Sequence, residues 1–565
     1  MAQVPTPTSL RFHGQHVRGI DLSRSSILFE GRFGRMFRAL PPAEFGTSDS
    51  KSEENLTQLA SKVAADLDCP KDAADAEESG IPSLYTYLGQ FIDHDLTFDP
   101  ASSLQRQNDP DALEDFRTPR FDLDCVYGRG PDDQPYMYTS DDTQRFLLGK
   151  ALTGGGPSNT KARDLPRSTA LRADGSVDPK ERRRAIIGDP RNDENVIVSQ
   201  LQGLFLKFHN RLAGENPSLS LTEVQRLLRF HYQWVVTTDF LKRIVTEPVL
   251  KKVLPHLFEK NGNVRSHPPQ LAFYHFRNEP FMPLEFSAAA YRFGHSMVRP
   301  GYRLNDGTFD PNTDTLLPIF PFLDPAKKCR NFPESLTGFR EPLTAWAIDW
   351  ARFIPLDPRL TCGDEDENNP ANRNRLQLAY RIDTSVVNPL SMLPKFVANN
   401  PSSLPARNLL RGWRMRLPSG QNVARAMGEP VLSDDHILIG KFVDNPDPDE
   451  KPKPILEAVV DGVGDAARRK ELTDAFTGNC PMWVYILAET RHHQTPMPVP
   501  CGGSTKKIST PQLGPVGGRI VAEVFAGLLL GDSHSFWNQD PLWRPAAVAK
   551  GGVFELKDFV SYALG

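Results

Sequence analysis

Residues 84–100 read LYTYLGQFIDHDLTFDP, and their spacing predicts an amphipathic helix. At about 100° per residue the apolar side chains gather on one face: Leu84, Tyr87, Leu88, Phe91 and Ile92. Gln90 and His94 lie one above the other on a flank of that face, with Asp93 beside them. Asp95 falls within the apolar face itself, where a carboxylate is tolerable only if it is paired or binds a metal. We therefore expect two polar sites on this helix, one at Gln90 and His94 and one at Asp95.

The overall composition excludes several classes of partner. The chain has 565 residues, with 66 Lys plus Arg against 70 Asp plus Glu, so its net charge is only -4. This balance indicates neither a nucleic acid nor a membrane surface as the main partner. The sequence contains no run of 18 apolar residues, so we expect no membrane-spanning helix. The 50 prolines, about twice ordinary usage, indicate many irregular connections between helices.

The cysteines and the N-terminal residues bear on the compartment. The first residues, MAQVPTPTSLRFHGQHVRG, contain no apolar core of a secretory signal peptide. The six cysteines are scattered without a CxxC pair, which predicts neither a zinc framework nor a disulfide scaffold: Cys69, Cys125, Cys329, Cys362, Cys480 and Cys501. A reducing compartment is the simplest interpretation. We expect a protein that is cytoplasmic or exported without a cleaved signal.

A second acidic pattern follows in FRTPRFDLDCVYGRGP at residues 116–131. Thr118, Arg120, Asp122 and Asp124 alternate with apolar residues, which places both aspartates on one side of an extended segment. Oxygen ligands at this spacing, without Cys or His, suit a hard cation such as Ca²⁺. The segment alone favours a solvated strand edge. Asp95, which needs a partner, shifts the balance toward a metal.

Apolar periodicity predicts a series of further helices. IIGDPRNDENVIVSQLQGLFLKFHNRLAGENP at 186–217 predicts a helix that begins near Asn192 or Asp193, with Arg191 and Glu194 at its start. An ion pair or a solvated helix end is the ordinary explanation of those two charges. Other helices are expected at 222–245, behind a capping box of Ser220 and Glu223, at 343–353, and in the apolar stretch that Gly531 closes. No clean strand pattern appears beyond short pairs, so the fold class is mainly α with long ordered loops.

The segment PLEFSAAAYRFGHSMVRP at 283–300 surrounds His295 with small residues. Ala288–Ala290 and Gly294 leave room for a flat, bulky group, while Arg292 and Arg299 flank the histidine on a predicted helix. A lone histidine is more often structural, and the small residues raise the odds of a ligand. No nucleophile elbow, P-loop or GxGxxG motif is present.

These motifs together resemble the animal-type haem peroxidases of the peroxidase–cyclooxygenase superfamily. The matching stretches are GQFIDHD, TPRFDLDCVYG, GDPRNDEN with HNRLA, YRFGHSMVRP and RNLLRGWR, in the family's order over roughly residues 80–430. The resemblance implies a helical core around a buried haem. It divides the chain into an N-terminal arm, residues 1–75, and a haem peroxidase catalytic domain, residues 76–565.

The resemblance also implies roles for residues on the two faces of the haem. His94, Gln90 and Arg191 match the distal histidine, glutamine and arginine, and His295 matches the proximal iron ligand. The other expected haem contacts are Asn408, which holds the second ring nitrogen of His295, Arg292 near a propionate, and Asp93 and Glu194 at the positions of ester links to the haem.

The same resemblance implies a calcium site and an activity. The calcium ligands are Asp95, Thr118, the Arg120 carbonyl, Asp122 and Asp124. The expected reaction uses hydrogen peroxide to oxidise halides, thiocyanate or small phenolic donors through a ferryl porphyrin-radical intermediate, as in a response to oxidative stress. Haem b, for which Asp93 and Glu194 are the candidate ester-link positions, and Ca²⁺ are the expected cofactors, and a monomer is the expected state.

Two departures from the family pattern refine this expectation. Asn195 stands where the chloride-oxidising member has a haem-bonded methionine, so bromide, iodide or thiocyanate is expected over chloride. Arg292 stands where cyclooxygenase-like members need a tyrosine, and Tyr291 is one residue off, which makes a fatty-acid dioxygenase the second hypothesis. A metal phosphohydrolase built on His94 and Asp95 needs further His and Asp ligands at helical spacing. The only nearby candidates are His209, His231 and His295, and none forms such a pattern. A helical interaction protein with an inert site is the non-enzymatic alternative.

Overall fold

The computed structural model describes residues 31–98, 114–115, 117–140, 144–169, 174, 176, 183–260, 262–276, 279–307, 315–357, 362–398, 400–444, 446 and 450–565. The first 30 residues of the predicted N-terminal arm therefore lie outside the described residues. In the rest of that arm, β1 (Gly31–Gly34) pairs with β3 (Glu114–Asp115) and β4 (Met282–Pro283), and α2 (Asp49–Val63) packs against α11 (Leu404–Arg414). The division at residue 75 stays a prediction.

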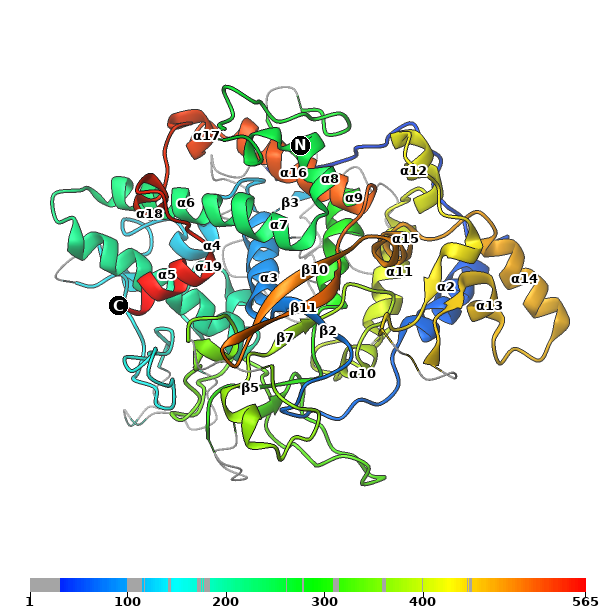
Figure 1. Cartoon of the computed structure of the whole chain (residues 1–565), viewed down its shortest axis with the longest axis horizontal. Coiled ribbons are helices and arrows are strands. Elements are labelled where there is room, and N and C mark those ends of the chain that lie inside the picture. The colour runs from blue at the N-terminus through cyan, green and yellow to red at the C-terminus, as the bar shows by residue number, and fades with distance from the viewer. Residues whose placement is uncertain are drawn as a thin grey trace, which may run out of the picture.

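Helix α3 (Leu84–Leu96) lies near the middle of the molecule (Figure 1). It packs against the 20-residue α5 (Val196–Glu215), where Phe91 stacks on Phe205 with 4.2 Å between the ring centroids. It also contacts three short elements, which are β2 (Glu78–Pro82), α4 (Asp124–Tyr127) and the 3₁₀-helix η6 (Ala290–His295). Apart from β2, which directly precedes α3 in the sequence, these contacts bring three later parts of the chain to one helix.

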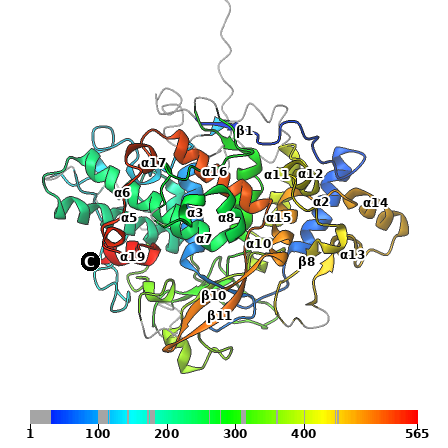
Figure 2. The ribbon, with the colours of Figure 1, turned by 45° about the horizontal axis from the view of Figure 1, so that its top comes forward.

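Other helices surround this centre on both sides, as Figures 1 and 2 show. They are α6 (Leu221–Val235), α7 (Leu241–Ile244), α8 (Glu247–Val253), α9 (Leu284–Ser287), α10 (Asn388–Ser391), α12 (Gly420–Met427), α13 (Ile455–Val460), α14 (Ala466–Phe476), α15 (Met482–Glu489), α16 (Gly517–Gly531), α17 (Phe536–Gln539), α18 (Ala546–Ala549) and α19 (Leu556–Leu564). None of the described helices combines the length and the hydropathy that a membrane span requires.

The sheets are small, which confirms the mainly α fold class. Besides the three-stranded sheet of β1, β3 and β4, the described residues form only two-stranded pairs. These pairs join β2 with β7 (Leu378–Tyr380), β5 (Gly301–Arg303) with β6 (Leu316–Pro318), β8 (Leu438–Ile439) with β9 (Lys453–Pro454), and β10 (Gln494–Cys501) with β11 (Ser504–Pro511). The last pair is a long hairpin that sequence periodicity missed. Its strand β10 carries three prolines, which usually argue against a strand, while Gly502 and Gly503 supply the positive φ angles of its turn.

Several predicted helix boundaries need correction. The helix expected at 222–245 has its capping box, but a π-helical turn at Val236–Phe240 separates α6 from α7. Helix α5 begins three residues later than expected, because the Asn195 side chain caps it by accepting from Ile197 N and Val198 N. The helix expected at 343–353 is wrong. Only Trp350–Arg352 forms a 3₁₀ turn, since the backbone before it bonds to other loops, as in Ala347 N to Thr153 O.

The expectation that the chain has no disulfides is also wrong. Cys69 bonds to Cys329 and Cys362 to Cys501, across 260 and 139 residues. Cys125 and Cys480 are buried free thiols. No spacing pattern reveals pairs that only the tertiary fold brings together. Disulfides are typical of oxidising compartments, so the cysteines no longer favour a reducing one.

Candidate active site

His94 lies buried near the C-terminal end of α3, and its ring is fixed from the side of Nδ1. Asn192, in the 3₁₀-helix η3 (Pro190–Asp193), places its Oδ1 2.7 Å from His94 Nδ1. Asn192 Nδ2 donates to Gln202 Oε1 at 2.9 Å, which turns the amide oxygen toward the histidine. Oδ1 therefore accepts from Nδ1–H, and Nε2 keeps a lone pair that can take a proton.

Arg191 is held beside this histidine by a buried carboxylate. Its guanidinium bonds to Asp189, 2.7 Å from NH2 to Oδ2, and donates to the His94 carbonyl at 2.9 Å. Asp189 also accepts from Arg117, whose NH1 lies 3.0 Å from Asp124 Oδ2. The two arginines hold the pKa of Asp189 well below its usual range despite complete burial. Asp189 therefore stays ionised and fixes Arg191 in a single position.

Glu194, Gln90 and Asn195 complete this side of the site. Gln90 donates to Glu194 Oε1 and accepts from Asn195 Nδ2 at 3.2 Å, and His94 Nε2 lies 3.6 Å from Glu194 Oε1. Asp93, one residue before His94, accepts from Thr97 Oγ1 at 3.1 Å. The predicted distal residues thus lie together, while the ester links at Asp93 and Glu194 stay predictions.

His295 sits at the end of η6, which contacts α3. Asn408 on α11 places its amide nitrogen 2.9 Å from His295 Nδ1. Burial, with the nearby charge of Arg292, lowers the pKa of His295 to about 3, so the imidazole is neutral at physiological pH. A neutral imidazole with one nitrogen anchored is the form that binds a metal.

The segment around His295 differs from the predicted helix. Residues 284–295 form the short α9 and then η6, with a break at Ala288 and Ala289. Arg299 does not join Arg292 in a positive stripe, because it is buried and paired with Glu78. Arg292 instead donates to the Ser287 carbonyl at 3.0 Å and lies 3.4 Å from Asn408 Oδ1.

The residues present fit a haem between α3 and η6. A Cβ placed on Gly294 would meet no atom within 4 Å, so there is open space beside His295. Five polar side chains in the surrounding core remain partly exposed: Gln90, Asp93, Glu194, Arg292 and His295. Partly exposed polar groups next to open space in a buried region are what a polar-rimmed cofactor would cover.

The acidic cluster next to His94 has the donor set of a cation site. Oxygens of Asp95, Asp122 and Asp124 lie within 4.8 Å of one another. Asp95 is fully buried, and neither of its oxygens has a hydrogen-bond partner among the described residues. Burial and the two neighbouring carboxylates raise the pKa of Asp95 well above its usual range. Thr118 Oγ1 donates to Asp122 Oδ2 at 2.6 Å, whereas the role of the Arg120 carbonyl stays a prediction.

The extended geometry expected for these ligands is wrong in part. Asp124 begins the helical turn α4, and Leu123 adopts a positive φ of 59°. The aspartates nevertheless converge, because the turn rather than strand alternation brings them to Asp95. Neither His209 nor His231 contributes to the cluster. His209 bonds to Tyr127 and to the Gln144 carbonyl, and His231 to the Leu227 carbonyl, which argues against the phosphohydrolase.

Sequence reasoning missed Asn192, Asp189 and Arg117. Asn192 and Asp189 stand in the same motif as Arg191, but the sequence indicates Asn192 only as a candidate start of the helix, and Asp189 gave no signal of its own. Arg117 precedes the acidic pattern and gave no periodic signal. Only their spatial meeting beside α3 identifies them.

Comparisons with known proteins place part of the chain beside known peroxidases. The family model for animal haem peroxidase matches residues 115–338. Dual oxidase of Drosophila melanogaster is 31% identical over 123 residues, which are 22% of this chain and 7% of that protein. Chorion peroxidase of the same organism is 30% identical over 180 residues, 30% of this chain and 21% of that protein. The chain thus spans a small part of the length of these relatives.

A solved structure extends the likeness to the whole fold. Peroxidase A from Dictyostelium discoideum superposes with a TM-score of 0.51 at 14% sequence identity, covering 92% of each chain. At that identity the likeness concerns the fold alone. Residues 115–338 therefore match the animal haem peroxidase family, and the likeness in fold to this solved peroxidase extends over most of the chain.

Proposed function

We propose that the protein is a haem peroxidase that reduces hydrogen peroxide and oxidises a small anionic or phenolic donor. The observation that carries the proposal is that two histidines with different surroundings lie on contacting elements, His94 on α3 and His295 on η6. His94 has an anchored Nδ1 and a basic Nε2 beside Arg191, while His295 is neutral and anchored by Asn408. Acid–base chemistry suits the first histidine, and metal ligation suits the second.

Haem would be held by His295 through Nε2, with Arg292 near a propionate and Asp93 and Glu194 as the carboxylates available for ester links. When bound, haem supplies the redox-active iron at which peroxide is reduced. His94 Nε2 takes a proton from hydrogen peroxide and returns it to the oxygen that leaves as water, acting as base and then as acid. Arg191 stabilises the negative charge that develops as the O–O bond breaks.

The donor supplies the two electrons that peroxide accepts, and is thereby oxidised. A halide, peroxide and one proton give a hypohalous acid and water. Asn195 caps α5 and donates to Gln90. As an asparagine, it has no sulfur atom that could bond to a haem. This supports bromide, iodide or thiocyanate over chloride.

The dioxygenase alternative rests on one tyrosine. Tyr291 is buried, stacks on Phe286 at 4.7 Å between ring centroids, and its hydroxyl has no hydrogen-bond partner among the described residues. The position three residues before His295, where the resemblance requires a tyrosine, is Arg292. The peroxidase therefore remains the first proposal.

We propose that Ca²⁺ occupies the cluster of Asp95, Asp122 and Asp124. The two unpartnered oxygens of a fully buried Asp95 need a positive charge within reach. A cation there would steady the end of α3 that carries His94, one residue away.

Replacement of His94 tests the acid–base role. His94→Ala is expected to keep the Soret band of bound haem and to lose peroxidase turnover by a factor of about 10² to 10⁴, because no group then moves the proton. His295→Ala is expected to lose the Soret band, and the exposed His436→Ala serves as the control. Normal turnover in His94→Ala, or no Soret band in the wild type after haem supplementation, would contradict the assignment.

Replacement of Asp189 tests how Arg191 is held. Asp189→Asn removes the charge that fixes the guanidinium, so the rate with peroxide is expected to fall by about 10²-fold while haem absorbance is retained. Asp444→Asn is the matched control, since it loses a two-point ion pair with Arg381, and neither residue is assigned to the site. Equal rates in the two variants would rule out the role of Asp189.

Donor preference is measured with purified holoenzyme and hydrogen peroxide. Bromide, iodide or thiocyanate is expected to be oxidised faster than chloride at equal concentration. Halide-dependent product formation is the measurement. Full turnover of a polyunsaturated fatty acid with O₂ and without peroxide would favour the dioxygenase instead.

Calcium removal tests the acidic cluster. A strong chelator is expected to lower the melting temperature of the wild type by several degrees, because a ligand that binds only the folded state stabilises it. Asp95→Asn should contain less calcium by elemental analysis and should lose most of the chelator effect. Asp474→Asn, on the surface of α14 and paired with Lys470, is the control. A melting temperature of the wild type that ignores the chelator would argue against the site.

A further inference from the structure

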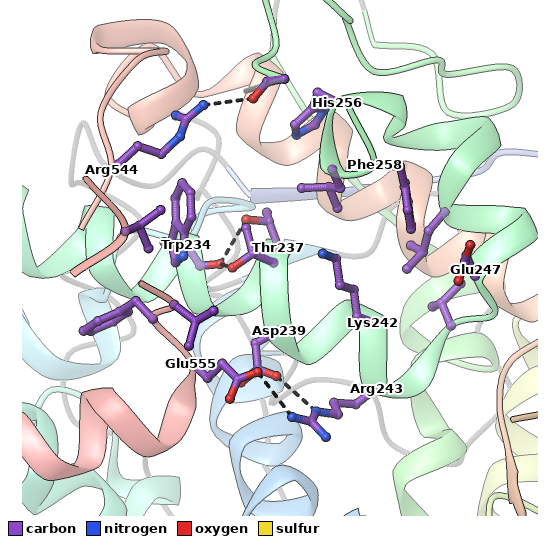
Figure 3. A pocket seen from close by; sticks show the side chains of 18 of the residues that line it. Trp234, Thr237, Asp239, Lys242, Arg243, Glu247, His256, Phe258, Arg544 and Glu555 are labelled. Atoms are coloured by element: carbon purple, nitrogen blue, oxygen red, sulfur yellow. Dashed lines mark hydrogen bonds and ion pairs between the residues drawn. The ribbon is translucent and has the colours of Figure 1, made fainter. Parts of the chain in front are cut away.

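A large open pocket lies apart from the candidate active site, with a volume of about 560 Å³ (Figure 3). Its walls come from the π-helical turn with α7, from α8, from the hairpin β10–β11 and from the C-terminal segment 536–555. None of the residues assigned above to haem, peroxide or calcium lines it. The volume lies within the range of pockets that bind small organic molecules.

Aromatic side chains form part of the apolar lining of this pocket, beside aliphatic ones such as Leu250 and Val264. The lining includes five aromatic rings from four segments: Trp234, Phe258, Phe536, Trp537 and Phe554. Trp234 and Phe536 lie 6.1 Å apart between ring centroids. Flat rings offer edge and face contacts that suit an aromatic ligand better than a flexible alkyl chain.

Lys242 supplies an ammonium group that no carboxylate of the pocket neutralises by direct contact. Figure 3 shows its side chain reaching into the space between Trp234 and Phe258. Its Nζ lies 5.5 Å from the centroid of the Phe258 ring, and it interacts electrostatically with the carboxylates of Asp239, Glu555 and Glu247 at longer range. Although the side chain is exposed, surrounding protein lowers the pKa of Lys242, because it limits hydration of the ammonium. An anion in the pocket would restore a favourable environment.

The other charged side chains of the lining already have partners. Arg243 binds Asp239 at 3.1 Å and lies 3.6 Å from Glu555, and Glu247 pairs with Lys251 at 2.5 Å. Arg544 donates to backbone carbonyls, including Gly262 O at 2.9 Å. Burial lowers the pKa of His256 to about 4, so this ring is neutral and does not compete with Lys242 for an anion.

We propose that this pocket binds a small aromatic carboxylate, whose carboxylate pairs with Lys242 and whose ring packs on the aromatic side chains of the lining. The π-helical turn supports a ligand site, since such turns occur frequently at functional sites. The site goes beyond the peroxidase chemistry. Its nearest link to that chemistry is the hydrogen bond from Tyr85 to Asp239 at 2.6 Å. Tyr85 precedes His94 by nine residues on α3, a rise of about 14 Å.

Titration calorimetry on the holoprotein, without peroxide, tests the pocket. The ligands are 1-naphthylacetate, its neutral amide and octanoate. The wild type is expected to bind 1-naphthylacetate saturably at one site, and the amide and octanoate at least tenfold more weakly. Lys242→Met is expected to weaken binding of the acid about tenfold, and Lys242→Arg to restore most of it.

Lys251→Met is the matched control, because Lys251 also lies over Phe258, 5.4 Å from its ring, but is paired with Glu247 and does not line the pocket. Binding in this variant should equal that of the wild type. No saturable binding, or equal affinity in Lys242→Met, would overturn the proposal. Octanoate binding as tight as that of the aromatic acid would overturn the aromatic class. Peroxidase turnover is measured separately, so failure of either proposal leaves the other standing.

Discussion

A single buried carboxylate, Asp189, connects the main parts of the candidate active site. It accepts hydrogen bonds from Arg191, which reaches His94, and from Arg117, which reaches Asp124 in the acidic cluster. A fully buried aspartate is stable as an anion only because two guanidinium groups surround it. Removing one partner would leave a buried charge uncompensated, which costs more than the lost bond alone. The loop before α5 and the turn before α4 are thereby fixed relative to each other.

Helix α3 gives these charges their common frame. Its apolar face is buried against α5, and this packing leaves Asp95 in the core without a partner and His94 beside Asn192 and Glu194. The face of α3 on which a polar residue lies therefore determines its environment and the chemistry available to it. Fully enclosed Asp95 calls for a cation, whereas His94 keeps a basic nitrogen beside Arg191. Asp95 and His94 are adjacent in sequence but differ in their surroundings, because the Asp95 side chain is fully buried without a partner and the His94 ring bonds to Asn192.

Much of this arrangement could be predicted, and the failures have physical causes. The amphipathic period of residues 84–96 predicts α3 and the unusual position of Asp95, since burial follows from helix geometry. The roles of His295 and Asn408 came from family resemblance, because no local pattern links residues 113 positions apart. Asn192, Asp189 and Arg117 were missed for the same reason. The segment at 343–353 misled because its tryptophans are buried in a loop that bonds to other loops.

The disulfide between Cys69 and Cys329 has a consequence for synthesis of the chain. Cys69 leaves the ribosome 260 residues before its partner exists. At 5 to 20 residues per second this interval is about 13 to 50 s. During that time Cys125, a thiol that ends up buried and unpaired, is the only other cysteine yet made. Correct pairing therefore requires that Cys125 is withdrawn into the core beside α3 early, or that a wrong bond is later exchanged.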